Sequence, residues 1–310
     1  MAAGLEILAR PAATADHTQP SRYRPVGFIL GLMGLGIGIA AVIGNFVAAG
    51  DVGDGTSTRE TLAWTFALTV ASFGTIKLGI SIVLMGVLIR AWMRVDSVKA
   101  GLANLKGPGG GATLSGEFDS PQGKAIAGTT APGTLMIHKI APKLWAPMLV
   151  MGVMGLMAGV VLGFIQAGTE DTENFLTIAA WTQGLMFLAE GFMLAAITFL
   201  LASILRVLRD GGGEVQETLG VTVKTLRMPL SAKVFMVIMA MGMMLAMAQF
   251  VLYIVVAYAD ERAAWFAWLG TLRELSLGLL LMSVVLALYT IGTVLSFQFN
   301  RMRDIVTTGD

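Results

Sequence analysis

The motif Met33-Gly34-Leu35 with Gly38 decides the fold, because it occurs three times along the chain. The other copies are Met154-Gly155-Leu156 with Gly159 and Met241-Gly242-Met243 with Ala246. Each copy lies in a long hydrophobic segment that is followed by a second one. A pattern that recurs at long intervals indicates repeated structural units that bury surface against one another. The sequence therefore predicts three copies of a helical hairpin.

Composition places these hairpins in a membrane. Of the 310 residues, 55% are hydrophobic and 13% are charged, and the mean hydropathy is +0.76. A soluble domain of this size could not bury so much apolar surface. Six segments reach the ~20 residues that a helix needs to cross hydrocarbon; they cover residues 26–50, 61–90, 144–167, 175–205, 234–258 and 263–294. We expect an all-α integral membrane protein with six transmembrane helices arranged as three repeated helical hairpins.

The distribution of charge predicts the orientation. Basic residues gather before the first span and after each even-numbered span, whereas acidic residues dominate the other three connections. In those acidic connections the only basic residues are Arg59 and Arg262. The positive-inside rule then places both termini in the cytoplasm. We expect a multi-pass protein of the cell (inner or plasma) membrane.

The spans and charges divide the chain into seven parts. In order, they are a cytoplasmic N-terminal segment (1–25), hairpin repeat 1 (26–95), a cytoplasmic Gly/Pro-containing loop (96–143), hairpin repeat 2 (144–209), a cytoplasmic loop (210–232), hairpin repeat 3 (233–303) and a C-terminal tail (304–310). The even-numbered spans run past the bilayer into basic ends. Such ends anchor at lipid headgroups or form a docking surface for a partner.

Small residues four positions apart mark the first span of each hairpin. Small-xxx-small spacing lets helix backbones approach closely, and packing must hold helices together where lipid gives no hydrophobic drive. The residues expected at helix contacts are Gly34, Gly38, Gly155, Gly159, Gly242 and Ala246. A helix that slides or bends during transport is the alternative interpretation of the same spacing.

Charged residues inside the spans are the sharpest functional signal, because charges in hydrocarbon are costly and usually face a bundle interior or a water-filled cavity. They are Lys77, Glu190, Arg273 and Glu274.

Tryptophans align the second spans of the three hairpins and so relate the positions of these charges. Trp64, Trp181 and Trp265 fall at matching places, and Phe73, Glu190 and Glu274 follow nine positions later. This register puts the two glutamates at one depth and Lys77 one turn beyond Phe73, so one lysine could reach both carboxylates. The cluster is either an ion-pair network that fixes assembly or the site of a proton or ion path.

Other chemistry is poorly supported. The chain has no cysteine, and its two histidines, His17 and His138, lie outside the spans. We therefore expect no metal site, no cofactor and no catalytic triad, and the net charge of +1 argues against a nucleic-acid partner. The methionines of the fifth span spread around its helix, which is typical of adaptable packing.

The three-hairpin plan resembles that of the mitochondrial carriers. Their Pro-x-Asp/Glu-x-x-Lys/Arg signature does not follow Pro25, Pro142 or Pro229. The resemblance therefore covers the plan alone and carries no activity to this chain.

Together these features predict a non-catalytic integral membrane protein that scaffolds or stabilises a larger membrane protein complex. Its expected partners are the lipid bilayer and other membrane subunits or further copies of itself. The alternative is a transporter or channel for a small charged solute or a proton, with a central site near Lys77, Glu190 and Glu274.

Overall fold

The computed structural model describes residues 23–50, 55–105, 136–219, 221, 224, 226, 229–260 and 262–308. Within these ranges the chain forms long α-helices and no strands. The helices are α2 (Tyr23–Gly50), α3 (Gly55–Leu105), α5 (Met136–Ala167), α6 (Thr172–Leu219), α7 (Leu230–Ala257) and α8 (Arg262–Thr308). Each of these six helices contains a stretch long and apolar enough to cross a membrane.

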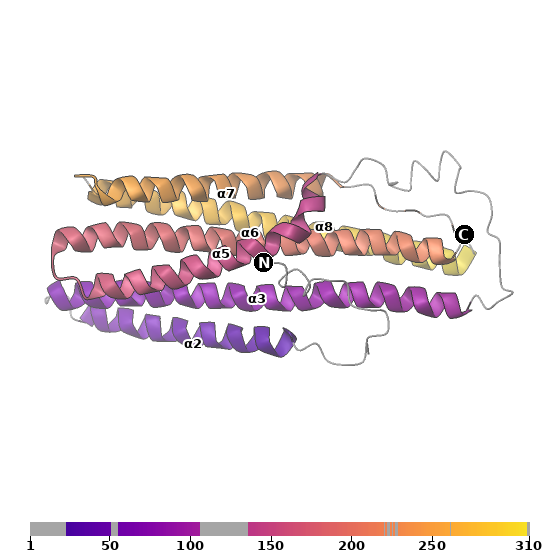
Figure 1. The fold of residues 1–310 in the computed structure, drawn as a ribbon, viewed down its shortest axis with the longest axis horizontal. Coiled ribbons are helices and arrows are strands. Elements are labelled where there is room, and N and C mark those ends of the chain that lie inside the picture. Colours follow the sequence, from indigo (N-terminus) through magenta and orange to yellow (C-terminus); the bar gives the residue numbers. More distant parts are fainter. Residues whose placement is uncertain are drawn as a thin grey trace.

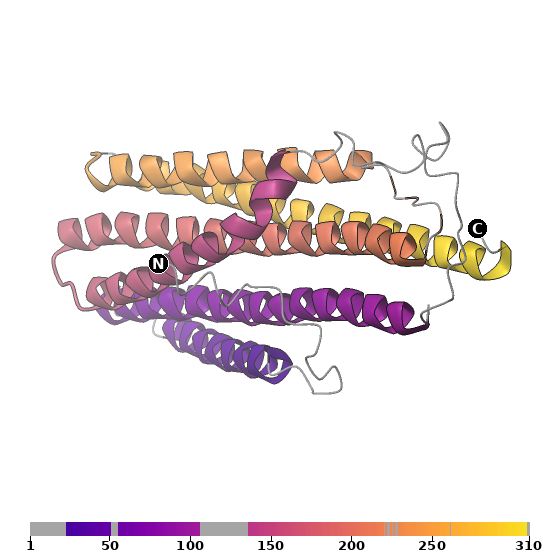
Figure 2. The same cartoon turned by 45° about the vertical axis from the view of Figure 1, so that its right-hand side comes forward.

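Helices that follow one another in the chain pack side by side, as α2 with α3, α5 with α6 and α7 with α8. Helix α6 lies in the middle and also packs against α3, α7 and α8 (Figures 1 and 2). Most of the apolar stretch of α6 is buried, whereas less than half of each other stretch is. The bundle is thus organised around α6, with α2 at its edge against α3.

The second helix of each pair (α3, α6 and α8) is much longer than a bilayer is thick. Helices α3, α6 and α8 have 51, 48 and 47 residues, or about 70–77 Å at 1.5 Å per residue, against a hydrocarbon core of about 30 Å.

These lengths shorten the loops that we expected from the sequence. Residues 96–105 and 136–143 of the first loop are helical, as are residues 210–219 and 230–232 of the second and residues 304–308 of the tail. Residues 106–135 and 1–22 lie outside the described residues.

The surface of the bundle is rich in apolar side chains, and some polar groups are buried among the apolar side chains of its interior. Large apolar side chains on α2, α5, α7 and α8 are exposed, which suits contact with lipid. Hydroxyl groups are buried between helices, as at Ser72, Thr198 and Ser276. The Thr198 and Ser283 hydroxyls, for example, lie 3.2 Å apart and join α6 to α8. Hydrogen bonds and close packing of this kind drive helix association in lipid.

Candidate functional site

A buried carboxylate on α6 lies between two cations from different helices. Glu190 has a side chain that is 3% exposed, and its Oε1 lies 3.2 Å from Lys77 Nζ on α3. Its Oε2 lies 3.6 Å from a terminal nitrogen of Arg273 on α8. We call Lys77, Glu190 and Arg273 the Glu190 cluster. One side chain of the central helix thus links helices from the first and third pairs.

The Glu190 cluster holds two positive groups for one negative group. The Lys77 and Arg273 side chains are 15% and 25% exposed. Among the described residues, Glu190 Oε2 and Arg273 Nε have no hydrogen-bond partner, although the guanidinium lies 5.9 Å from the centre of the Phe66 ring. With all three groups charged, the cluster carries a net charge of +1. The four charged side chains inside the predicted spans, two positive and two negative, therefore do not balance one another at this site.

Glu274, which we expected to share Lys77 with Glu190, is exposed on the outer face of α8. Consecutive helical residues point about 100° apart, so Arg273 can face inward while Glu274 does not.

The contacts between helices explain why the tryptophan register fails here. Ser72 Oγ donates to Gly34 O at 2.6 Å, and Ser276 Oγ donates to Gly242 O at 3.0 Å. Ser72 comes eight residues after Trp64, whereas Ser276 comes eleven after Trp265. Matching these contacts shifts α8 by three residues and takes Glu274 out of the position of Glu190.

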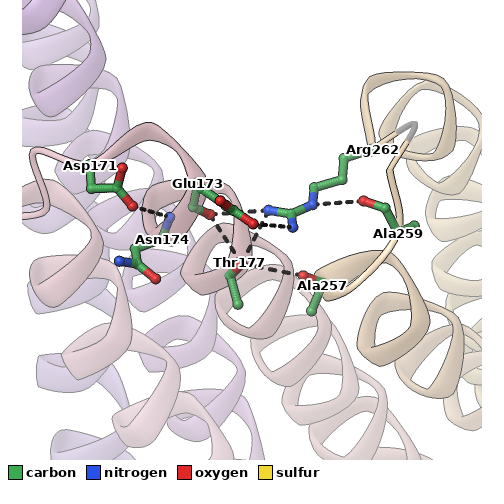
Figure 3. A network of polar contacts seen from close by, with 7 residues as sticks. All are labelled: Asp171, Glu173, Asn174, Thr177, Ala257, Ala259 and Arg262. Carbon is green, nitrogen blue, oxygen red and sulfur yellow. Dashed lines mark hydrogen bonds and ion pairs between the residues drawn. The ribbon is translucent and has the colours of Figure 1, made fainter.

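A second group of contacts joins the ends of the helices at the α5–α6 and α7–α8 turns, and it uses Arg59 and Arg262, the two basic residues of the acidic connections. Arg262 donates from Nε to Ala259 O at 2.9 Å and from a terminal nitrogen to Glu173 O at 3.1 Å. It also lies near the Thr177 hydroxyl, which bonds to Ala257 O (Figure 3). The turn between α7 and α8 is thereby held on the first turns of α6.

Arg59 of α3 holds the same end of the central pair from the other side. Its guanidinium donates to Thr169 O at 3.3 Å and to Glu170 O at 3.0 Å. It lies 4.6 Å from the centre of the Phe175 ring. Carbonyls after the end of α5 are good acceptors for a cation, because the C-terminal end of a helix carries partial negative charge.

A third group of contacts lies at the other end of α6, centred on Gln216. Its amide nitrogen donates to Lys224 O at 2.9 Å, and its amide oxygen accepts from Lys224 N at 2.8 Å. The same oxygen accepts from Arg301 Nε of α8 at 3.2 Å. Arg209 Nε donates to Leu226 O at 3.2 Å. The chain after α6 therefore folds back on α6 and α8 through buried polar side chains.

The six small residues expected at helix contacts all lie at close approaches. A Cβ atom on Gly34 would meet Ser72 O at 2.8 Å, and one on Gly38 would meet Ser72 Oγ at 2.7 Å. Gly155 and Gly159 face Ala189 and Met186 of α6, and Gly242 faces Leu280 of α8.

Ala246 differs from the others in its partner. It is buried against Gly191, so it joins α7 to the central helix instead of to α8.

Sequence reasoning missed Ser72, Ser276 and Gln216. The two serines could have been found from their place opposite the glycine motif, since buried hydroxyls are common between membrane helices. Gln216 gave no such signal, because it lies beyond the span predicted over residues 175–205 and bonds to backbone atoms that folding alone brings near.

Within the described residues, no group of three or more His, Asp or Glu side chains is placed to hold a metal ion. Comparison of the chain with protein-family models, with curated proteins and with solved structures gives no match.

Proposed function

We propose that this chain is a non-catalytic integral membrane protein that scaffolds or stabilises a larger membrane protein complex. The observation that supports the proposal best is the 3.2 Å ion pair between Lys77 and the almost fully buried Glu190. A carboxylate that both neighbouring helices contact directly is typical of a group that fixes assembly. A solute site instead leaves its charged groups facing open space.

Three levels of contacts on α6 support the same proposal. Arg59 and Arg262 contact its first turns, Lys77 and Arg273 contact its middle, and Arg301 contacts Gln216 near its far end. Each level joins α6 to helices from outside its own pair. A frame held at both ends and in the middle gives a fixed surface for other subunits, and it opposes the relative helix movement that transport requires.

The topology belongs to the proposal as well. We infer that the chain forms three repeated hairpins with both termini in the cytoplasm. We also infer that it lies in the inner or plasma membrane of the cell. The matching bonds from Ser72 to Gly34 and from Ser276 to Gly242 support a shared hairpin design. The basic ends of α3, α6 and α8 support the orientation.

Native co-migration and a deletion strain test this function. The full chain, purified from its own membranes in mild detergent, should migrate with other membrane subunits. Removing the chain should lower the abundance of that assembly, and the Glu190→Gln variant should lower it in proportion to its own loss of stability. Migration as a single species, with no membrane assembly reduced in the deletion strain, would contradict the proposal.

A transporter or channel for a small charged solute or a proton is the second candidate. The net charge of +1 in the Glu190 cluster favours it, because a bound anion would complete the balance. Purified chain in lipid vesicles, with a pH-sensitive dye or a chloride-sensitive dye inside, separates the two functions. The scaffold proposal expects no flux above that of empty vesicles. Flux that Glu190→Gln abolishes while the protein stays folded would establish transport.

A further inference from the structure

The exposed face of α8 carries a carboxylate, for which lipid tails offer neither a hydrogen-bond donor nor a cation. Glu274 is exposed, and among the described residues no hydrogen bond or ion pair reaches it. It comes twelve residues after Arg262, which belongs to the polar contacts at the outer end of the bundle. Twelve residues of helix correspond to about 18 Å. Glu274 therefore lies in the outer half of the span predicted over residues 263–294, where an unpaired charge is costly.

The residues that share this face with Glu274 leave room for another helix. They recur at alternating spacings of four and three, which is the pattern of a helix-packing seam. We call them the Glu274 face: Glu274, Gly278, Leu281, Val285, Leu288 and Gly292. All are exposed, and a Cβ atom on Gly278 or Gly292 would meet nothing within 4 Å. Two small residues flanking larger ones let a neighbouring backbone come close.

Among the residues that the structure describes, a second copy of this chain has no basic side chain placed to supply the missing cation. Two copies joined through this face by a two-fold axis along the membrane normal would bring their Glu274 carboxylates to the same depth. The exposed basic side chains of the described helices include Lys143 and Lys233, which lie near the starts of α5 and α7, at the opposite end of α7 from its turn into α8. Lys77 and Arg273, which lie deep in the spans, already contact Glu190.

We propose that the Glu274 face binds a transmembrane helix of a different protein, which places a lysine or arginine beside the Glu274 carboxylate. This inference rests on the proposed function and names the chemistry of one partner. The cation neutralises the carboxylate, and Gly278 lets the partner helix approach within one turn of it. Opposite charges at this depth select the partner, because a helix without a basic residue leaves the carboxylate unpaired.

Synthetic membrane helices test the proposal directly. The chain lacks cysteine, so one cysteine introduced at the exposed Thr172 carries an acceptor dye on the full-length protein. The probe is a donor-labelled Leu/Ala helix with a single lysine in its outer third, and the matched probe carries methionine instead. Energy transfer in phosphatidylcholine vesicles measures association. The lysine helix should bind about ten-fold more tightly than the methionine helix, or about 1.4 kcal/mol.

Three variants of the chain locate the contact. Glu274→Gln should remove the preference for lysine, and Gly278→Leu should weaken binding of the lysine helix by a similar factor. Met244→Leu, on the exposed face of α7, should change neither and serves as the control.

Each other outcome overturns the inference. Equal binding of both probes, no binding of either, or a lysine preference that survives Glu274→Gln would show that this face recognises no basic helix. Energy transfer between two labelled copies of the chain that is lost in Glu274→Gln would assign the face to self-association.

The test also separates this inference from the scaffold proposal. If the native assembly persists in Glu274→Gln and the probes do not bind, the Glu274 face does not bind a basic helix, and the scaffold proposal stands. If the lysine preference is present and the native chain migrates alone, the face stands and the scaffold proposal fails.

Discussion

Replacing the Glu190 carboxylate with an amide should destabilise the chain more than removing either of its cations. Glu190→Gln leaves two cations, both within 3.6 Å of the altered group, without a counter-charge. Breaking a buried ion pair in this way costs about 3–5 kcal/mol. Lys77→Met leaves the carboxylate paired with Arg273 and removes one charge-assisted contact, which costs about 1.5–3 kcal/mol. Arg273→Met should cost less still, because its contact is longer and its side chain more exposed.

A double mutant tests the coupling. Adding Lys77→Met to Glu190→Gln removes one of the two unpaired cations, so the pair of changes should be more stable than Glu190→Gln alone. Coupling energies between contacting residues are typically about 0.5–3 kcal/mol. Thermal unfolding of the purified variants in one detergent, followed by tryptophan fluorescence, ranks them. Glu274→Gln is the matched control, and because its side chain is exposed it should unfold at the wild-type temperature.

Two results would refute this reasoning. If Glu190→Gln were as stable as wild type, the carboxylate would not hold the cations in place. If the losses of Lys77→Met and Glu190→Gln simply added, the two side chains would not interact in the folded chain.

Other predictions address packing, the far end of α6 and topology. Gly34→Leu should lower folded yield strongly because it forces a side chain against the Ser72 carbonyl, whereas Gly36→Leu should not, since nothing lies within 4 Å of its Cβ position; equal yields would contradict the close contact. Gln216→Leu should speed hydrogen exchange at the Lys224 backbone N–H, which donates to the Gln216 side chain. Unchanged exchange at Lys224 would show that the Gln216 side chain does not stabilise that segment. A cysteine at Thr172 should react with an impermeant thiol reagent added outside intact cells, and one at Asp210 should not; both positions are exposed, so the opposite result would reverse the orientation.

The six helices could be predicted from the sequence because hydropathy and length report membrane spans directly. Their ends could not, because Asp210–Leu219 carries three consecutive glycines and several polar residues and still continues α6. A Cβ atom on Gly212 would overlap the Gln298 side chain of α8, so close packing between the two helices keeps this weak stretch helical. Local composition does not report a contact with a residue so far along the chain.

The candidate site was predictable in part for a similar reason. The cost of charge in lipid singles out Lys77, Glu190, Arg273 and Glu274, and the turn spacing relates Lys77 to the position of Glu190. Whether Arg273 or Glu274 faces Glu190 depends on the rotation of α8 about its axis. The alignment on the tryptophans was wrong by three residues and therefore predicted the wrong rotation. The contact between Ser276 and Gly242 sets the actual rotation, and sequence alone gives it no priority over the tryptophan match.

Because the ribosome makes these residues in order, the Glu190 cluster forms in two steps during synthesis. Lys77 is already in the membrane when Glu190 emerges, but Arg273 follows Glu190 by 83 residues. At about 5–20 residues per second, the carboxylate waits roughly 4–17 s for its second cation. During that interval Lys77 alone neutralises it. A nascent Lys77→Met chain therefore carries a lone carboxylate into the lipid, and quality-control proteases should remove part of it before α8 is made. Its loss should then be greater in pulse-labelled insertion yield than in the melting temperature of the molecules that survive.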